Sequence, residues 1–490
     1  MSVPTSPLAD VLSRYEPVIG LEVHVQLGTA SKMFCRCEAR FGAAPNTLVC
    51  PVCAGHPGTL PVLNGEAVRL GVLAGLALSC DIDAVTRFDR KNYFYPDLPK
   101  AYQITQFDHP LCRDGVLRVE AGACEPFEVS ITRAHLEEDS GKIVHPEGMD
   151  ISLIDLNRAG TPLLEIVSGP DMHSAEQARA YLQELQRVLR HVGVSDADME
   201  KGQFRCDANV SLRPIGREAF GTRTETKNLN SFGFVAGALQ AEMIRQGALL
   251  DAGEEVLQLT MGFNPDTGLT HALRSKEEAH DYRYFREPDL PSFAIDPAWV
   301  QSLADELPEL PGARRRRYLD ELQLPPKQVE ALLADKSLAD WFDAAAEASG
   351  SPKQAANWLF TEVLRLVNEQ KRPLHELALT PERLAGLLTL VDVGAVSVQA
   401  GRLIVTALEE QPEQDARALA EALDLLQVSD DSALAGMVDE VLTEESDLVT
   451  RYREGNTALL NALLGAVMKK SRGKANPGSA RELLAARLEA

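Results

Sequence analysis

The 490-residue sequence has no long apolar run. Its longest apolar stretch, Leu70 to Cys80, is well short of the roughly 20 residues that a helix needs to cross a bilayer. The opening residues, MSVPTSPLAD, also lack the basic and then apolar order of a secretory signal peptide. We therefore expect no membrane association and a cytoplasmic location.

Positive charge is scarce. Lys and Arg total 49 against 72 Asp and Glu, and the resulting net charge of −23 argues against broad, nonspecific binding to nucleic acid. The balance reverses locally, because residues 376–465 carry 17 acidic and 5 basic side chains whereas residues 466–490 carry 6 basic and 2 acidic ones. A local basic site near the C-terminus is therefore compatible with the net negative charge of the chain.

Three common catalytic signatures are missing. The sequence has no G-x-x-x-x-G-K-[ST] phosphate loop, no G-x-S-x-G nucleophile elbow and no H-E-x-x-H helix. A P-loop NTPase, an α/β-hydrolase and a zincin are therefore disfavoured. The composition, 45% hydrophobic and 25% charged, is that of a globular protein, and the length indicates about two to four domains.

Eight cysteines are present, but disulfides are a poor explanation in a chain without a secretion signal. Four of them form two close pairs, Cys35-x-Cys37 and Cys50-x-x-Cys53, separated by twelve residues, and Gly42, Pro45, Pro51 and Gly55 mark the region as a loop. Two thiolate pairs linked by a loop are typical of a tetrahedral zinc site, and four thiolates leave no open position for catalysis. We expect a structural zinc; the alternative is four small core residues.

The residue pattern changes near residue 293. Earlier residues show short alternating runs with turn residues, typical of strands, whereas three prolines between residues 288 and 297 precede long helical patterns. The clearest helix is Ser351 to Glu369, with Ser351 as N-cap and Pro352 in the first turn. We expect three domains: residues 1–293, 294–400 and 401–490.

Two expected strands each present a polar face. In Val18–Leu27, Glu22, His24 and Gln26 alternate with apolar residues. Phe204–Leu212 repeats the pattern, with Arg205, Asp207, Asn209 and Ser211 on the polar side. A solvated outer face explains either strand alone, but two such strands favour a chemical surface.

Acidic residues cluster between residues 133 and 142, where His135, Glu137, Glu138 and Asp139 stand close together. Glu165 and Glu225 stand out in other short segments, and Lys91, Arg205 and Lys227 are cations that could offset phosphate charge. Oxygen-rich sets suit magnesium and its phosphate ligands. On spacing alone, an ordinary acidic surface is slightly favoured over a magnesium site.

Six further segments are distinctive: Val18–Leu27, Arg90–Lys100, His135–Asp139, Arg205–Pro214, Asp281–Phe285 and Val467–Pro477. They closely resemble the B-subunit family of tRNA-dependent amidotransferases, and the likeness spans essentially the whole chain. Two departures stand out. Arg286 replaces the family's usual Pro, and Met261–Phe263 replaces a basic residue and Trp in a segment that we expect to be a loop.

The resemblance implies an α+β fold, in which a cradle domain related to glutamine synthetase is followed by a helical domain and by a mobile helical tail that binds tRNA. It also implies the use of ATP and magnesium to phosphorylate the side-chain carboxylate of Glu-tRNA(Gln) or Asp-tRNA(Asn). Ammonia then displaces phosphate to form the amide. The sequence does not choose between the two aminoacyl-tRNAs.

The resemblance also implies roles for particular residues. We expect the catalytic magnesium ligands to be Glu22, His24, Glu137 and Glu138. Around the nucleotide or acyl group we expect Lys91, Asp207, Asn209, Glu225 and Lys227. For contact with tRNA phosphates we expect Lys469, Lys470, Arg472 and Lys474.

The chain has no recognisable amidase or Cys-based glutaminase signature, so a partner must supply ammonia. In the family an A subunit hydrolyses glutamine and a small C subunit joins it to the B subunit, which implies a heterotrimer. Two alternatives stay open. One is a noncatalytic tRNA-binding scaffold, and the other is an independent ligase that amidates free glutamate.

Overall fold

The computed structural model describes residues 7–120, 124–146, 148–274, 282–427, 431–471 and 474–489. The chain divides into two compact units, Met1–Arg314 and Arg315–Ala490. The first combines a large sheet with helices, and the regular elements described in the second are all helices, which confirms the α+β fold class. The expected domain boundaries at residues 293 and 400 stay predictions.

All described strands lie in the first unit. They are β1 (Tyr15–Gln26), β2 (Asp81–Ile82), β3 (Val85–Thr86), β4 (Asp89–Asn92), β5 (Tyr102–Thr105), β6 (Cys112–Val119), β7 (Phe127–Glu138), β8 (Lys142–Val144), β9 (Leu153–Asp155), β10 (Pro162–Ser168), β11 (Phe204–Pro214), β12 (Thr224–Leu229), β13 (Thr260–Asn264), β14 (Leu269–Arg274), β15 (Phe285–Arg286) and β16 (Phe293–Ala294).

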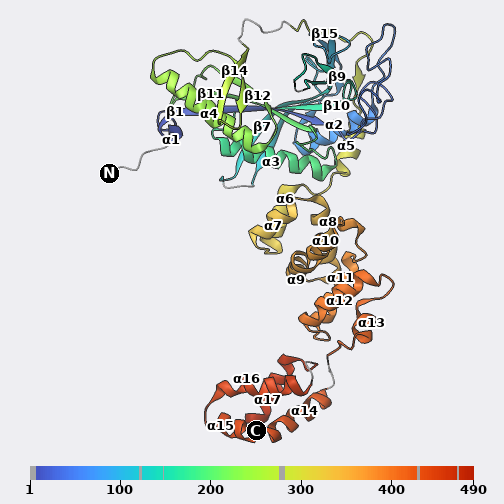
Figure 1. The fold of residues 1–490 in the computed structure, drawn as a ribbon, viewed down its shortest axis with the longest axis vertical. Coiled ribbons are helices and arrows are strands. Elements are labelled where there is room, and N and C mark those ends of the chain that lie inside the picture. The colour runs from blue at the N-terminus through green and yellow to red at the C-terminus, as the bar shows by residue number, and fades with distance from the viewer. Residues whose placement is uncertain are drawn as a thin grey trace. The chain divides into compact units, whose positions relative to one another are not determined.

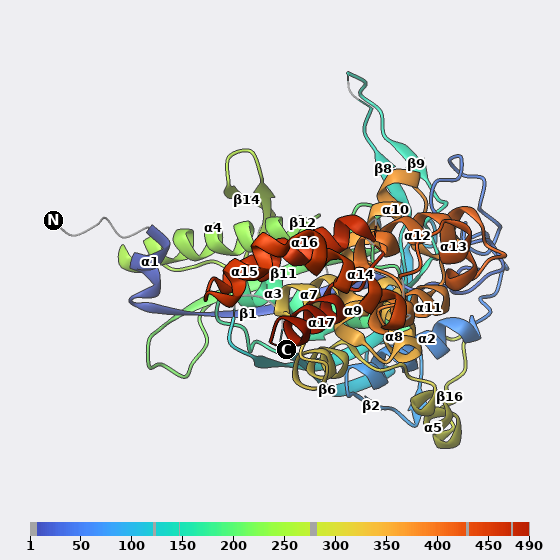
Figure 2. The same cartoon turned by 90° about the horizontal axis from the view of Figure 1, so that it is seen from below.

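Twelve of the described strands form one mixed sheet, ordered β14-β13-β12-β11-β1-β10-β7-β5-β4-β15, with β6 beside β7 and β2 beside β6. Strand β1 lies near the middle and pairs antiparallel with β10 on one side and with β11 on the other. The short pair β8 and β9 forms a separate ribbon that projects from the main sheet (Figure 2). The long central strands β1, β10, β11 and β7 therefore share one continuous surface.

Helices cover one face of this sheet (Figure 1). The helices of the first unit are α1 (Pro7–Leu12), α2 (Gly65–Ala77), α3 (Ala175–Val192), α4 (Phe232–Asp251) and α5 (Pro297–Asp305), and α6 (Pro311–Arg316) contains the division between the units. Helix α3 begins where the Ser174 side chain accepts the N–H of Gln177, and it ends at Gly193, whose φ of 78° favours glycine.

The core of the first unit lies between the sheet and these helices. Ile19, Leu21 and Val23 of β1 are fully buried there, together with Tyr181 of α3 and Val235 of α4. Because successive side chains of a strand point to opposite faces, Glu22 and His24 lie on the face away from the helices. The expected alternation of β1 is therefore confirmed.

Two local expectations were wrong. Met261–Phe263 is not a loop but part of β13, where Met261 is buried and Phe263 packs against the core. The segment after Ser351 is helical but not one regular helix, because a π-helical turn at Leu359–Val363 separates α9 from α10. Ser351 makes no capping hydrogen bond there, since its hydroxyl donates to Asp392 instead.

The second unit consists of helices. They are α7 (Pro326–Leu333), α8 (Lys336–Ser349), α9 (Pro352–Trp358), α10 (Leu364–Gln370), α11 (Pro381–Asp392), α12 (Val398–Glu410), α13 (Ala416–Ala422), α14 (Asp431–Glu444), α15 (Ser446–Arg453), α16 (Leu460–Lys470) and α17 (Pro477–Glu489), with π turns at Arg317–Glu321 and Leu359–Val363 and 3₁₀ turns at Leu374–Glu376 and Thr457–Leu459.

Two separate hydrophobic clusters hold these helices. One runs from Tyr318 to Ala420, and the other joins α14, α16 and α17 through residues such as Leu434, Leu463 and Leu484. Among the described residues, no helix is both long enough and apolar enough to pass through a membrane.

Candidate functional site

The polar face of the main sheet carries residues that are distant in sequence but adjacent in register. His24 of β1 lies opposite Arg205 of β11 and opposite Glu165 of β10, and Glu165 in turn lies opposite His135 of β7. Directly paired residues of antiparallel strands point to the same face. Four neighbouring strands thus place a guanidinium, an imidazole, a carboxylate and a second imidazole in one row.

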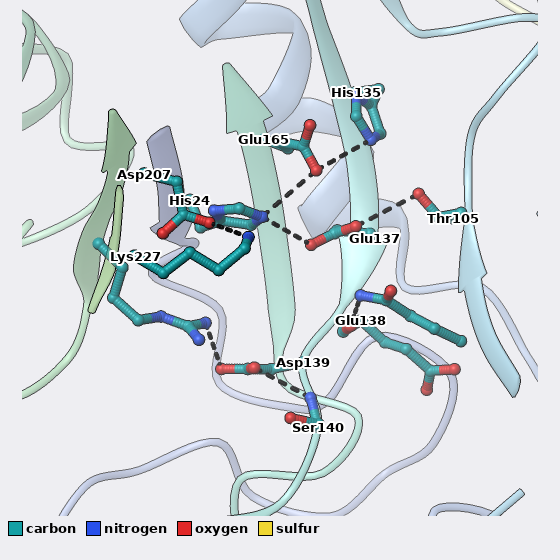
Figure 3. A network of polar contacts seen from close by, with 12 residues as sticks. His24, Thr105, His135, Glu137, Glu138, Asp139, Ser140, Glu165, Asp207 and Lys227 are labelled. Carbon is teal, nitrogen blue, oxygen red and sulfur yellow. Dashed lines mark hydrogen bonds and ion pairs between the residues drawn. The ribbon is translucent and has the colours of Figure 1, made fainter. Parts of the chain in front are cut away.

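Glu137 stands in the next row and completes a three-residue cluster. The Nε2 atom of His24 lies 3.3 Å from Glu165 Oε2 and 3.6 Å from Glu137 Oε1 (Figure 3). One potential ligand atom from each of these residues lies within 4.8 Å of the other two. The Thr105 hydroxyl donates to Glu137 Oε2 at 3.3 Å and helps to orient this carboxylate.

The electrostatics of the cluster favour a cation. Burial would lower the pKa of His24, but the hydrogen bond to Glu165 and the charges of Glu165 and Glu137 raise it to about 9. Burial and the charge of Glu165 raise the pKa of Glu137. Two buried carboxylates beside the same imidazole nitrogen therefore keep the His24 ring protonated, and a divalent cation with nitrogen and oxygen ligands suits the same place.

A cavity of about 300 Å³ opens beside the cluster and is lined by both His24 and Glu137. Three cations, Lys91, Arg205 and Lys227, also line it. Burial would lower the pKa of Lys91, but the nearby charge of Glu137 raises it, so the ammonium stays charged. The cavity therefore brings together a cation-binding cluster and three side chains that suit phosphate oxygens.

The other nucleotide-site candidates lie on β11 and on its neighbour β12. Lys227 Nζ is 2.6 Å from Asp207 Oδ2 and 2.9 Å from Glu225 Oε1, so these three form one ion-pair group. Asn209 Nδ2 donates to Glu22 Oε1 at 3.2 Å. Glu22 and Asn209 line a second cavity, of about 330 Å³, and not the one that contains His24.

Glu138 does not join the three-residue cluster, although it follows Glu137 directly. Its carboxylate accepts the N–H of Ile104 at 2.9 Å and forms a close ion pair with Lys100. Consecutive side chains of a strand point to opposite sides, and Glu138 accordingly lines a different cavity, together with Cys35 and Cys53. The structure thus brings together His24 and Glu137 and leaves Glu22 and Glu138 apart from them.

Glu165 was not among the four residues expected as magnesium ligands, yet it lies beside His24 and Glu137, where Glu138 does not. The signal was present in the sequence, because Glu165 is the single charged residue in the mostly apolar strand Pro162–Ser168. A carboxylate in such a run is costly to bury unless it has a charged or metal partner. Here His24 and His135 lie 3.3 and 3.6 Å from its Oε2 atom.

The four clustered cysteines meet in space as expected. One sulfur from each of Cys35, Cys37, Cys50 and Cys53 lies within 4.8 Å of the others. The Cys53 sulfur is 4.0 Å from that of Cys37 and 3.9 Å from that of Cys50. Zinc–sulfur bonds of about 2.3 Å in a tetrahedron separate the sulfurs by roughly 3.8 Å, so one zinc ion fits this set.

The tail residues differ in their surroundings. Lys469 is exposed on α16, whereas Lys470 Nζ lies 2.8 Å from Glu440 and 2.6 Å from Glu444. Lys474 is paired with Asp424, and Arg472 lies outside the described residues. Of the three described lysines, Lys469 therefore presents its charge most openly to a ligand.

Comparison with known proteins gives consistent results along the chain. Residues 17–301 match the family model of the GatB/GatE catalytic domain, and residues 340–488 match that of the GatB domain. The B subunit of the aspartyl/glutamyl-tRNA(Asn/Gln) amidotransferase of Geotalea uraniireducens is 49% identical over 97% of this chain and 99% of its own length. The protein of the same name from Thermodesulfovibrio yellowstonii is 45% identical over 96% of this chain and 98% of its own.

Proposed function

The chain belongs to the GatB/GatE family of amidotransferase B subunits, and on this basis we propose that it converts Glu-tRNA(Gln), Asp-tRNA(Asn) or both into the corresponding amides. It first activates the side-chain carboxylate with ATP and then lets ammonia react with it. The observation that carries this proposal is the cluster of His24, Glu137 and Glu165 beside a cavity lined by cations.

Activation is needed because a carboxylate is a poor electrophile. Its oxygen attacks the γ-phosphorus of ATP, the bond to ADP breaks, and the carboxylate becomes an acyl phosphate. Ammonia then attacks the carbonyl carbon, phosphate leaves, and the nitrogen loses a proton. Such phosphoryl transfer depends chiefly on positioning and on charge stabilisation.

The side chains of the cavity suit these tasks. His24, Glu137 and Glu165 would hold magnesium, which when bound would neutralise part of the phosphate charge. Lys91 would stabilise phosphate oxygens, because its ammonium is charged and lines the cavity. Lys227 is held by Asp207 and Glu225, and this group would orient the nucleotide or the acyl group.

The remaining parts of the proposal concern architecture and partners. The first unit would be a cradle of the glutamine-synthetase type, with zinc holding the loop of Cys35 to Cys53. An amidase A subunit would release ammonia from glutamine, and a small C subunit would complete a heterotrimer. The helical tail would bind tRNA through Lys469 and its neighbours.

One assay tests the function directly. The purified complex is given ATP, magnesium and glutamine with Glu-tRNA(Gln), with Asp-tRNA(Asn) or with free glutamate, and ADP release is measured beside amide formation. ADP release that requires an aminoacyl-tRNA supports the proposal. Release with free glutamate alone would indicate an independent ligase, and tRNA binding without any ADP release would indicate a scaffold.

A further inference from the structure

Four aromatic side chains form a continuous series at the edge of the main sheet. The ring centroids of Tyr93 and Tyr282 are 6.0 Å apart, and those of Tyr282 and Tyr284 are 6.1 Å apart. Tyr284 and Phe107 then stack at 4.1 Å with their planes only 9° apart. Two regions that are far apart in the sequence, residues 93–107 and 282–284, thus contribute to one row of rings.

This series connects the proposed reaction cavity with the surface. Tyr93 and Lys91 line the cavity beside Glu137, and Lys91 Nζ lies 4.9 Å from the centre of the Tyr282 ring. At the other end, Phe107 is 44% exposed. The rings therefore lead from the charged interior of the cavity to solvent, with a cation beside them.

Core packing does not account for the series. The described core of the first unit includes none of the four residues Tyr93, Phe107, Tyr282 and Tyr284. They are also not among the partly buried side chains that pack against this core. Phe94 and Tyr95, which follow Tyr93 directly, are 84% and 58% exposed. Three exposed rings, those of Phe94, Tyr95 and Phe107, thus accompany the half-buried tyrosines, and exposed apolar area of this kind indicates a binding surface.

The chemistry of the substrate identifies the occupant. The carboxylate that must reach Glu137 belongs to an amino acid esterified to the 3′ end of a tRNA, so the last, unpaired nucleotides must lie at the mouth of the same cavity. Unpaired bases bind to proteins mainly by stacking on aromatic rings, with nearby cations meeting the phosphates.

We infer that the series Phe107, Tyr284, Tyr282 and Tyr93 is the stacking surface for the unpaired 3′-terminal nucleotides of the aminoacyl-tRNA, with the exposed ring of Phe107 receiving a base from outside. This inference rests on the proposed function. It adds the place at which the nucleic-acid end of the substrate is held while its carboxylate lies in the cavity.

A double-mutant cycle on tRNA binding tests the inference without using the reaction. Binding of deacylated tRNA(Gln) to the assembled complex is measured for the natural 3′ end and for an end that lacks the base before the terminal nucleotide. We expect removal of the base to weaken binding to the wild-type complex about tenfold, since one stacked base contributes on that order.

The variants give the decisive comparison. Phe107→Leu should weaken binding of the natural tRNA by a similar factor but show little further loss with the abasic tRNA, because both changes remove the same contact. Tyr284→Leu should change both affinities in the same way as Phe107→Leu. Tyr284→Phe should bind both tRNAs with wild-type affinity, because it keeps the ring. Phe41→Leu is the control, since Phe41 is a 66% exposed ring in another part of the first unit.

Three results would overturn the inference. The first is that Phe107→Leu and removal of the base weaken tRNA binding by fully independent factors. The second is that Phe107→Leu binds natural tRNA with unchanged affinity. The third is that Phe107→Leu fails to assemble with its partner subunits, which would assign the rings to a protein interface. A coupled loss of tRNA binding in a complex that never cleaves ATP would instead refute the proposed function and leave the inference standing.

Discussion

The first unit contains two groups of residues that can each hold a metal ion, and they differ in almost every physical respect. Cys35, Cys37, Cys50 and Cys53 come from one short segment and offer four sulfurs. His24, Glu137 and Glu165 come from three strands and offer one nitrogen and two carboxylate oxygens. The first group suits zinc and the second a harder cation such as magnesium.

The surroundings of the two groups differ as well. Lys32 is fully buried beside the cysteines, and its Nζ lies 3.5 Å from the Cys53 sulfur and 2.8 Å from the Leu48 carbonyl oxygen. The hydrogen bond from Cys35 lowers the pKa of Cys53 against the effect of burial, and the Lys32 charge lowers it further. His24 and Glu137, by contrast, line a cavity of about 300 Å³.

Under the proposed function, the cysteine group would be a structural metal site and the cluster on the sheet a reactive one. Four thiolates complete a tetrahedral shell and leave no position for a substrate. Three ligands beside an open cavity leave positions that water or phosphate oxygens can fill. The two groups should therefore respond to mutation in opposite ways, one in stability and the other in activity.

The largest effect is expected at the cluster on the sheet. Glu137→Gln and Glu165→Gln each remove one of its two carboxylate charges, so either change should lower aminoacyl-tRNA-dependent ATP cleavage by about a hundredfold or more. Affinity for tRNA and the melting temperature should change little. The measurements are ADP release under saturating substrate, filter binding of tRNA and a thermal melt.

Glu138→Gln is the matched comparison, because it changes the same side chain at the next position of β7. The Glu138 carboxylate is held by Lys100 and the Ile104 N–H, away from His24. We therefore expect a smaller loss of ATP cleavage and a measurable loss of stability. If Glu137→Gln and Glu138→Gln lost ATP cleavage equally, both residues would belong to the metal site. That result would contradict a metal site formed by His24, Glu137 and Glu165 alone.

The cysteine group should show the opposite response. Cys50→Ser removes one of four ligands, so the purified protein should lose most of its zinc and its melting temperature should fall by roughly 5 °C or more. Residual ATP cleavage by the folded fraction should stay near normal. Metal analysis and a thermal melt decide the outcome.

Cys124→Ser provides the control for this substitution, because Cys124 is a partly buried cysteine outside the group of four. It should leave the zinc content unchanged. If wild-type protein expressed with ample zinc contained none of the metal, the cysteines would be four unpaired thiols and the comparison between the two sites would fail.

The two groups of potential metal ligands also show which features of a site can be predicted from the sequence. The cysteines lie within 19 consecutive residues, so their spacing alone predicts that they meet. The alternation along β1 and β11 likewise predicts the polar faces of Glu22, His24 and Asp207, because a strand directs alternate residues to one side. Local pattern therefore predicts both the zinc group and the existence of a polar sheet face.

Register could not be predicted in this way. Glu165 meets His24 only because β10 pairs with β1 in a register that brings these two residues opposite each other, and no local pattern contains that information. The resemblance implied Glu138 as a ligand together with its neighbour Glu137, yet consecutive side chains of a strand point to opposite sides. The π turn at Leu359–Val363 was missed because the apolar spacing there also fits an α-helix.

A smaller effect is expected from the charge beside the cysteines. Lys32→Met removes the buried ammonium that lies against Cys53 but keeps an apolar stem of similar length. Groups that support metal ligands typically change metal affinity by about 10- to 100-fold, so zinc should be lost at lower chelator concentration. Arg40→Met, an exposed base that pairs with Glu38, should leave zinc retention unchanged. Equal retention in all three proteins would show that Lys32 serves only to fill space.

The smallest effect is expected in the tail, where the same principle separates Lys469 from Lys470. A lysine that is already held by protein carboxylates releases fewer counterions on meeting a phosphate, so Lys469→Ala should reduce the salt dependence of tRNA binding more than Lys470→Ala does. For one phosphate contact the slope of log affinity against log salt should change by about 0.9. Point substitutions suit this test better than truncation, because Leu484 and Leu488 of α17 are buried in the tail's own core. Filter binding over a salt series gives the slopes, and identical slopes for wild type and both variants would mean that tRNA phosphates are held elsewhere on the complex.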